Sequence, residues 1–258
     1  MGSDFVKFVV RAAAFAVLAA ATWPSAAKAH DFFLLPEQFH GGGNFEVHST
    51  VGAAFPAPET VVGQERIAEL RASDGASIAV AGPGDQSLRL TLTAARPGAH
   101  VAGVRILPRD VEYEGERIGL IMEEYEVSAE AREAVAALAA PRVLRATSER
   151  FAKTIVCSET CAGSAAVEAF GYPLEFVADA SGANQFRLLL NGRPLANYPV
   201  AIATTGARTS ATTDAEGRLT ANLDGEGPFM LFAAHMAPPA EAGGRFPMLL
   251  TSLTVSGH

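Results

Sequence analysis

The sequence predicts a mainly β protein, built of two β-sandwich units joined by a short helical connector. Of the 258 residues, 49% are apolar, which is enough to fill a core and excludes an intrinsically disordered chain. Apolar and polar residues alternate in Leu88–Leu92, as on a strand with one buried face. Turn-forming segments such as Gly82–Asp85 and Arg96–Gly98 separate short apolar runs, as expected for antiparallel strands joined by turns.

The first 29 residues have the features of a secretory signal peptide. Lys7 and Arg11 provide positive charge, Ala12–Trp23 is an apolar run, and Ala27–Ala29 has the small residues of a cleavage site. The run is shorter than the roughly 20 apolar residues of a membrane-spanning helix. We therefore expect residues 1–29 to be removed, leaving a periplasmic protein that begins at His30 and is not embedded in the membrane.

Residues 30–127 are expected to form the first sandwich. Short apolar runs follow one another between turn signals, at the spacing of antiparallel strands. The predicted strands are Phe45–Val51, Ile67–Arg71, Ser77–Val80, Leu88–Leu92 and His100–Ile106.

Residues 128–170 are expected to form the helical connector. Ser128 can cap a helix that runs through strong helix formers as far as Pro141. A second helix is predicted from Arg142 to about Val156, where apolar residues recur at rough helical spacing. Those residues are Val143, Leu144, Phe151 and Ile155.

Residues 171–258 return to strand patterns and predict a second, smaller sandwich. Gln185–Leu190 alternates and runs into Asn191-Gly192, a strong hairpin signal. Another turn, Thr213–Arg218, precedes a strand, and Phe229–His235 and Leu249–Val255 would complete the sheet.

The charge of the chain restricts its partners. The 20 Lys and Arg residues against 28 Asp and Glu residues give a formal net charge of −8. A nucleic-acid-binding protein needs a basic face, so cations or neutral molecules are the expected partners. The sequence also lacks a Gly-x-Ser-x-Gly elbow, a phosphate-binding Gly-Lys-Ser/Thr loop and a His-Glu-x-x-His helix, so we predict no enzymatic activity.

Several segments of the expected mature chain resemble the DUF4198 family. They are His30–Pro36, Ser148–Lys153, Gly192–Ala196, Thr213–Arg218 and Ala234–Met236. The turn at Thr213–Arg218 is shared with transthyretin-like and carboxypeptidase-regulatory-like modules. The resemblance implies an exported bacterial protein with an Ig-like sandwich followed by a transthyretin-like one. Some family members are associated with nickel or cobalt uptake systems, which implies a metal ion and a membrane permease component as partners.

His30 is the most informative candidate site residue. Cleavage after Ala29 would give it a free α-amino group, whose pKa of about 7.7–8.0 lets a metal displace its proton at neutral pH. The amine and the imidazole together form a chelate for a divalent transition metal such as nickel, cobalt, copper or zinc, with copper bound most tightly. The competing interpretation is that His30 simply starts an edge strand.

Three further histidines are candidate ligands. His235 ends an apolar strand, where a side chain can reach solvent, and we expect it to complete the site of His30. His48 and His100 lie within predicted strands, where a hydrogen-bonded structural role competes with metal binding.

Cys157 and Cys161 have two interpretations. An exported protein meets an oxidising environment, which favours a local disulfide. Alternatively, the two thiolates lie on one helical face and bind a soft metal.

The sequence thus predicts a periplasmic transition-metal-binding protein that serves metal uptake or buffering. A β-sandwich module that binds an envelope protein or a glycan without metal is the alternative. A copper-dependent oxidase that uses the N-terminal histidine is a further one.

Overall fold

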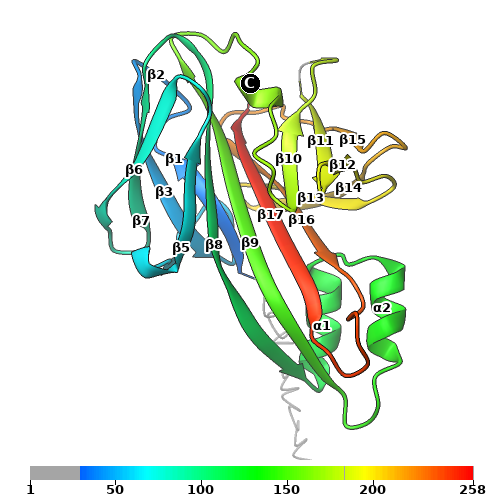
Figure 1. The fold of residues 1–258 in the computed structure, drawn as a ribbon. Helices are drawn as coiled ribbons and strands as arrows, with labels where there is room; N and C mark the ends of the chain where they lie inside the picture. The colour runs from blue at the N-terminus through cyan, green and yellow to red at the C-terminus, as the bar shows by residue number, and fades with distance from the viewer. Residues whose placement is uncertain (1–29, 183, 258) are drawn as a thin grey trace, which may run out of the picture.

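The computed structural model describes residues 30–182 and 184–257, which fold into three β-sheets and two short helices (Figure 1). The predicted mainly β fold is therefore confirmed. The expected signal peptide, residues 1–29, lies outside the described residues. No helix in the described ranges is long and apolar enough to cross a membrane.

An eight-stranded sheet forms the centre of the molecule. The strand order of this sheet is β14-β13-β16-β17-β9-β8-β5, with β2 paired to β9. Strand β17 runs parallel to β9 and antiparallel to β16. The strands are β2 (His40–Gly41), β5 (Ile67–Ala72), β8 (Gly98–Glu114), β9 (Val143–Ser158), β13 (Pro199–Thr204), β14 (Ala207–Thr212), β16 (Pro228–Met236) and β17 (Phe246–Ser256).

Two smaller sheets lie on either side of β8, β9 and β17 in Figure 1. The five-stranded sheet has the order β1-β3-β7-β6, with β4 paired to β3, and comprises β1 (Asp31–Pro36), β3 (Asn44–Gly52), β4 (Thr60–Val61), β6 (Ala76–Pro83) and β7 (Leu88–Ala94). The four-stranded sheet comprises β10 (Leu174–Ala178), β11 (Gln185–Leu190), β12 (Arg193–Pro194) and β15 (Arg218–Thr220).

The helices are α1 (Glu116–Glu124) and α2 (Ala129–Ala136), with 3-10 turns η1 (Gln64–Arg66) and η2 (Ala165–Val167). In Figure 1, α1 and α2 lie beside the lower ends of β9 and β17. The predicted cap of α2 is confirmed, because the Ser128 hydroxyl accepts a hydrogen bond from the backbone N–H of Ala131 at 3.3 Å. The sequence did not predict α1.

Successive side chains of the central sheet point to opposite faces, and each face packs against one of the smaller sheets to form a core. One cluster, with Phe32, Phe45 and Val104, fills the space between the five-stranded sheet and the central sheet. Another, with Phe176 and Leu231, lies between the four-stranded sheet and the central sheet. The two expected β units therefore share one sheet.

The second predicted helix, Arg142 to about Val156, is wrong, and the expected connector is largely strand. The segment forms β9, whose hydrogen bonds go to β8 on one side and to β17 on the other. Most of β9 is buried on both faces, so its apolar residues do not alternate and their spacing imitates a helix. The strands predicted in residues 30–127 are confirmed as β3, β5, β6, β7 and β8.

A buried ion pair links the central sheet to the four-stranded sheet. Nζ of Lys153 lies 2.9 Å from Oε2 of Glu175 and donates a hydrogen bond to the carbonyl oxygen of Phe176. The Glu175 carboxylate also accepts hydrogen bonds from the backbone N–H groups of Phe170 and Gly171. Neither charged side chain is more than 2% exposed, so each one depends on the other for neutralisation.

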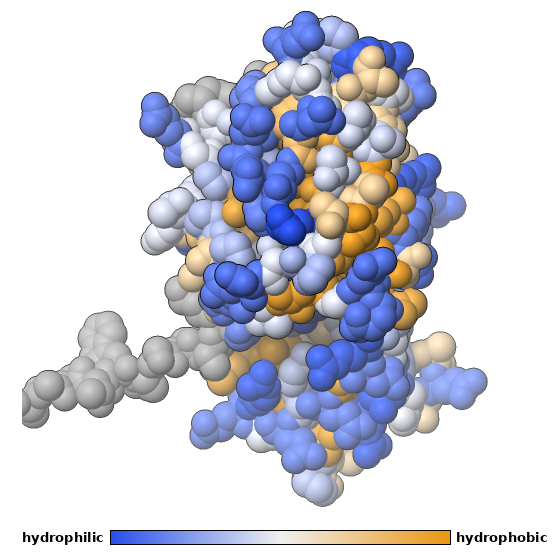
Figure 2. All heavy atoms as spheres, turned by 90° about the vertical axis from the view of Figure 1, so that its left-hand side faces the viewer, coloured by the Kyte–Doolittle hydropathy of each residue, from blue (hydrophilic) through white to orange (hydrophobic). Residues whose placement is uncertain are grey.

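Strands β5 and β6 are neighbouring edge strands of the central and five-stranded sheets. The edge strands β5 and β6 carry partly buried apolar side chains, including Leu70, Ile78 and Val80. Figure 2, seen from the side of the five-stranded sheet, shows an apolar strip bordered by polar side chains.

Candidate functional site

His30 lies at the surface immediately before β1. Its Nε2 is 3.3 Å from Oε2 of Glu59, and its side chain is 54% exposed. Its carbonyl oxygen accepts a hydrogen bond of 2.8 Å from Nη1 of Arg150 on β9. The next residue, Asp31, is buried and paired with Arg208 of β14. The backbone of His30 is thus fixed, while its imidazole remains accessible beside a carboxylate.

A pocket of about 630 Å³ opens beside His30. Segments from η1, the irregular part of β8 and β9 form its walls. Besides His30, its charged and hydroxyl-bearing side chains are Thr60, Glu65, Arg66, Arg109, Ser148 and Arg150.

His48 lies on β3 in a second group of ligating atoms. Its Nδ1 is 2.8 Å from Oγ of Ser87, and its Nε2 is 3.5 Å from Oε1 of Glu37. One ligating atom each of Glu37, Glu46 and His48 lies within 4.8 Å of the others. Glu46 and His48 share a face of β3 because they are two residues apart. This group is therefore a second candidate metal site.

His235 does not join His30. Ala234 and Met236 of β16 pack in the cluster that contains Phe33 of β1, so His235 between them points to the opposite face. There its ring packs against Tyr198, with ring centroids 5.7 Å apart. Nδ1 of His235 is buried and has no hydrogen-bond partner among the described residues. The expected pairing of His30 and His235 around one ion is not formed.

The environment of His235 predicts a pH dependence of stability. Burial lowers the pKa of His235, although Glu130 acts in the opposite direction. The unfolded chain therefore binds this proton more tightly than the folded chain does. Stability falls as the pH falls through the ordinary histidine pKa of about 6.5. We expect the free energy of unfolding to decrease less between pH 7.5 and 5.5 in His235→Gln than in the wild type, measured by urea unfolding. An equal decrease in His235→Gln and the wild type would contradict this prediction. His40→Gln is the control, because His40 is exposed.

His100 is 1% exposed, and its Nε2 lies 2.9 Å from the carbonyl oxygen of Arg96. In the described part of the chain, His100 belongs to no group of three or more potential metal ligands. The structure therefore gives His100 a structural hydrogen bond in place of a ligand environment.

Cys157 and Cys161 form a disulfide, so the thiolate interpretation is wrong. His40 lies close to both sulfurs, with Nδ1 3.8 Å from Sγ of Cys161. Disulfide sulfurs are not thiolates and do not serve as strong metal ligands.

The family model described as a domain of unknown function, DUF4198, matches residues 27–237. The chain belongs to the DUF4198 family. A search among proteins of curated function gave no match for this chain. Among solved structures, the "D0-D1 domain of Intimin" is 13% identical, with 88% of this chain and 97% of that chain covered at a TM-score of 0.18.

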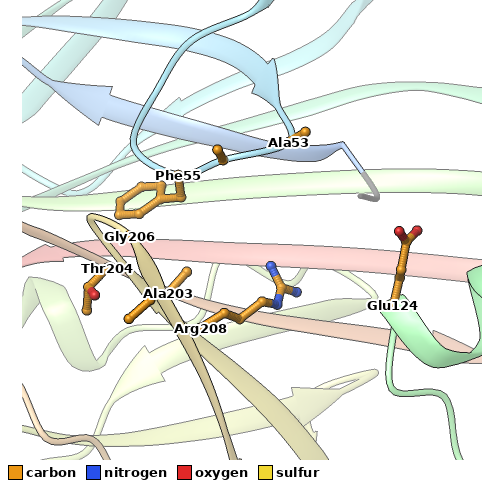
Figure 3. A pocket seen from close by; sticks show the side chains of 9 residues that line it. Ala53, Phe55, Glu124, Ala203, Thr204, Gly206 and Arg208 are labelled. Carbon is orange, nitrogen blue, oxygen red and sulfur yellow. The ribbon is translucent and has the colours of Figure 1, made fainter. Parts of the chain in front are cut away.

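A smaller pocket of this DUF4198 chain, about 220 Å³, lies near the start of β1. Figure 3 shows Phe55, Glu124 and Arg208 reaching it from three different segments. The guanidinium of Arg208 is already paired with Asp31. Burial raises the pKa of Asp31, and Arg208 opposes that shift. The Arg208 side chain of this pocket is therefore already in contact with a carboxyl group of the protein.

Sequence reasoning missed the acidic partners of His30 and His48 in this DUF4198 chain. Glu59 and Glu37 lie outside strands, where no periodic pattern indicates their direction. The position of Glu46 beside His48 was predictable, because residues two apart on a strand lie on the same face.

Proposed function

We propose that this protein is an exported protein that binds a divalent transition-metal ion at His30 and delivers or buffers it for an uptake system. The supporting observation is the contact of 3.3 Å between Nε2 of His30, which lines a pocket, and the Glu59 carboxylate. An accessible imidazole beside a carboxylate is a donor set that suits borderline metals.

Cleavage before His30 would add the α-amino group as a third donor. The hydrogen bond from Arg150 holds the His30 carbonyl, and β1 begins at the next residue, so the amine would be presented from an anchored backbone. Amine, imidazole and carboxylate would then meet one ion, with its remaining positions open for exchange. Open positions are what a protein that passes its metal on requires.

Nickel, cobalt and copper are the ions that this donor set favours. Association of some family members with nickel or cobalt uptake supports nickel or cobalt as the cargo and a permease component as the partner. The intrinsic affinity order places Cu²⁺ above both, so copper is included in the test.

The test is calorimetric titration of Ni²⁺, Co²⁺ and Cu²⁺ into protein that begins at His30. We expect one tight site, which one extra N-terminal alanine abolishes. Glu59→Gln should weaken binding by at least about 10- to 100-fold, the range for losing an outer-shell carboxylate, because here a direct donor is removed. His48→Gln serves as the matched control, because it removes the other accessible histidine–carboxylate group.

Equal binding by the extended protein, together with loss of binding in His48→Gln, would move the site to Glu37, Glu46 and His48. Absence of metal binding in every form would reject the metal-binding function and leave the partner-binding β-sandwich module.

A further inference from the structure

The pocket beside His30 collects arginines that the protein itself does not neutralise. Arg66, Arg109 and Arg150 line it, and in the described part of the chain none has a carboxylate oxygen within 4.0 Å. Other arginines are paired, for example Arg105 with Glu149 and Arg208 with Asp31. In a chain with a net charge of −8, unpaired arginines that meet in one pocket indicate an anionic ligand.

Two of these side chains are held in place by backbone carbonyls. Nη2 of Arg66 donates to the carbonyl oxygen of Leu107 at 2.6 Å, and Nη1 of Arg150 donates to that of His30 at 2.8 Å. The side chain of Arg109 makes no hydrogen bond or ion pair within residues 30–182 and 184–257. Its position follows an irregularity in the pairing of β8 with β9, between Ile106 and Arg109. Such an irregularity can direct a side chain away from the regular alternation of the strand.

A second, independent observation is the hydroxyl of Ser148. Ser148 is 4% exposed and lines the same pocket, yet its Oγ has no hydrogen-bond partner among the described residues. It pairs directly with Arg109 across β8 and β9, and Arg150 follows two residues later on the same face of β9. A buried hydroxyl without a partner is costly, and an oxygen atom of a bound ligand would satisfy it.

We propose that this pocket binds a small organic anion with two or three carboxylates, which completes the coordination of the metal ion at His30. Three guanidinium groups, against the carboxylate of Glu65 in the lining and that of Glu59 beside His30, leave the pocket positively charged. Guanidinium groups bind carboxylates through paired, charge-assisted hydrogen bonds. The volume of about 630 Å³ lies in the usual range of small-molecule sites.

The metal-coordinating part of this inference rests on the proposed function, whereas the anion-binding part stands without it. An organic anion with several carboxylates explains why the arginines lie beside His30 better than phosphate does. The carboxylates that do not bind arginine would add oxygen donors to the nitrogen donors of His30. The ion would then be carried as a chelate, with the organic anion anchored by arginines and the metal anchored by the imidazole.

The first experiment titrates citrate into metal-free protein that begins at His30. Citrate should bind, and Arg109→Gln should weaken binding by about 10- to 100-fold, the effect of losing a charge-assisted hydrogen bond. Ser148→Ala should also weaken it. Arg193→Gln, an exposed arginine on β12 outside this pocket, should leave it unchanged. Circular dichroism melting of each variant establishes that it is folded.

Absence of citrate binding, or equal binding by Arg109→Gln and the wild type, would overturn the proposal. Inorganic phosphate is titrated in parallel, and binding of phosphate without citrate would overturn the carboxylate class.

The second experiment compares citrate with nickel citrate. We expect Ni²⁺ to tighten citrate binding in the wild type and not in His30→Ala. Citrate binding that depends on Arg109 in a protein that binds no Ni²⁺ would sustain the anion pocket and reject the proposed function. Binding of Ni²⁺ at His30 without citrate binding would sustain the proposed function and reject the anion pocket.

Discussion

Lys153→Met should lower the free energy of unfolding by about 3–5 kcal/mol, the usual loss when one partner of a buried ion pair is removed. Glu175 is 0% exposed, so the variant would leave its carboxylate buried with two backbone N–H donors and no cation. The lost contact joins two sheets, so the four-stranded sheet should also separate more easily from β9. Urea unfolding followed by circular dichroism measures the effect; the sole tryptophan, Trp23, lies in the expected signal peptide and provides no fluorescence signal in the mature chain.

The double variant Lys153→Met with Glu175→Gln is the control for this prediction. A neutral amide retains an oxygen for the N–H groups of Phe170 and Gly171, so the double variant should lose less stability than Lys153→Met alone. Equal stability of Lys153→Met and the wild type would show that the pair does not neutralise a buried charge.

Phe33→Ala should cost about 3–5 kcal/mol, as expected for truncating a fully buried phenylalanine. Phe33 is 0% exposed on β1, and its ring meets that of Phe55 edge-on at a centroid distance of 5.2 Å. Its cluster also includes residues of α1, α2 and β16, so little in its surroundings can move into the space it leaves.

Val167→Ala is the matched control for Phe33→Ala, because Val167 is 37% exposed and surface truncations usually change stability by less than about 0.5 kcal/mol. Both variants are compared by urea unfolding. A loss in Phe33→Ala no larger than that in Val167→Ala would remove Phe33 from the core.

The strands β3, β6 and β7 were predictable because each has one covered face. Leu88, Leu90 and Leu92 are buried, while Arg89 between them faces solvent, so the pattern is visible in the sequence. In β9 the reverse holds, since Phe151, Ala152 and their neighbours are buried on both faces. The helix prediction there failed because tertiary pairing with β8 and β17 decides the conformation, and no local pattern records it.

The candidate site was predictable only in part. His30 stood out because of its position after the expected cleavage site, and the structure places its side chain at the surface. Its partner Glu59 comes from an irregular segment 29 residues later, and the arginines of the pocket come from three separate segments. Such groups meet through strand pairing and a local irregularity in β8, which sequence periodicity does not show.

The place of β17 has a consequence for how the chain reaches its native state. The last strand in the sequence lies between β16 and β9, in the interior of the largest sheet. Its pairing with β9 joins residues about a hundred positions apart, such as Thr154 and Thr254, and such high contact order slows folding. Until residues 246–256 have been synthesised, β9 and β16 have open edges and the sheet cannot close. The central sheet is therefore completed only after residues 246–256 have been made.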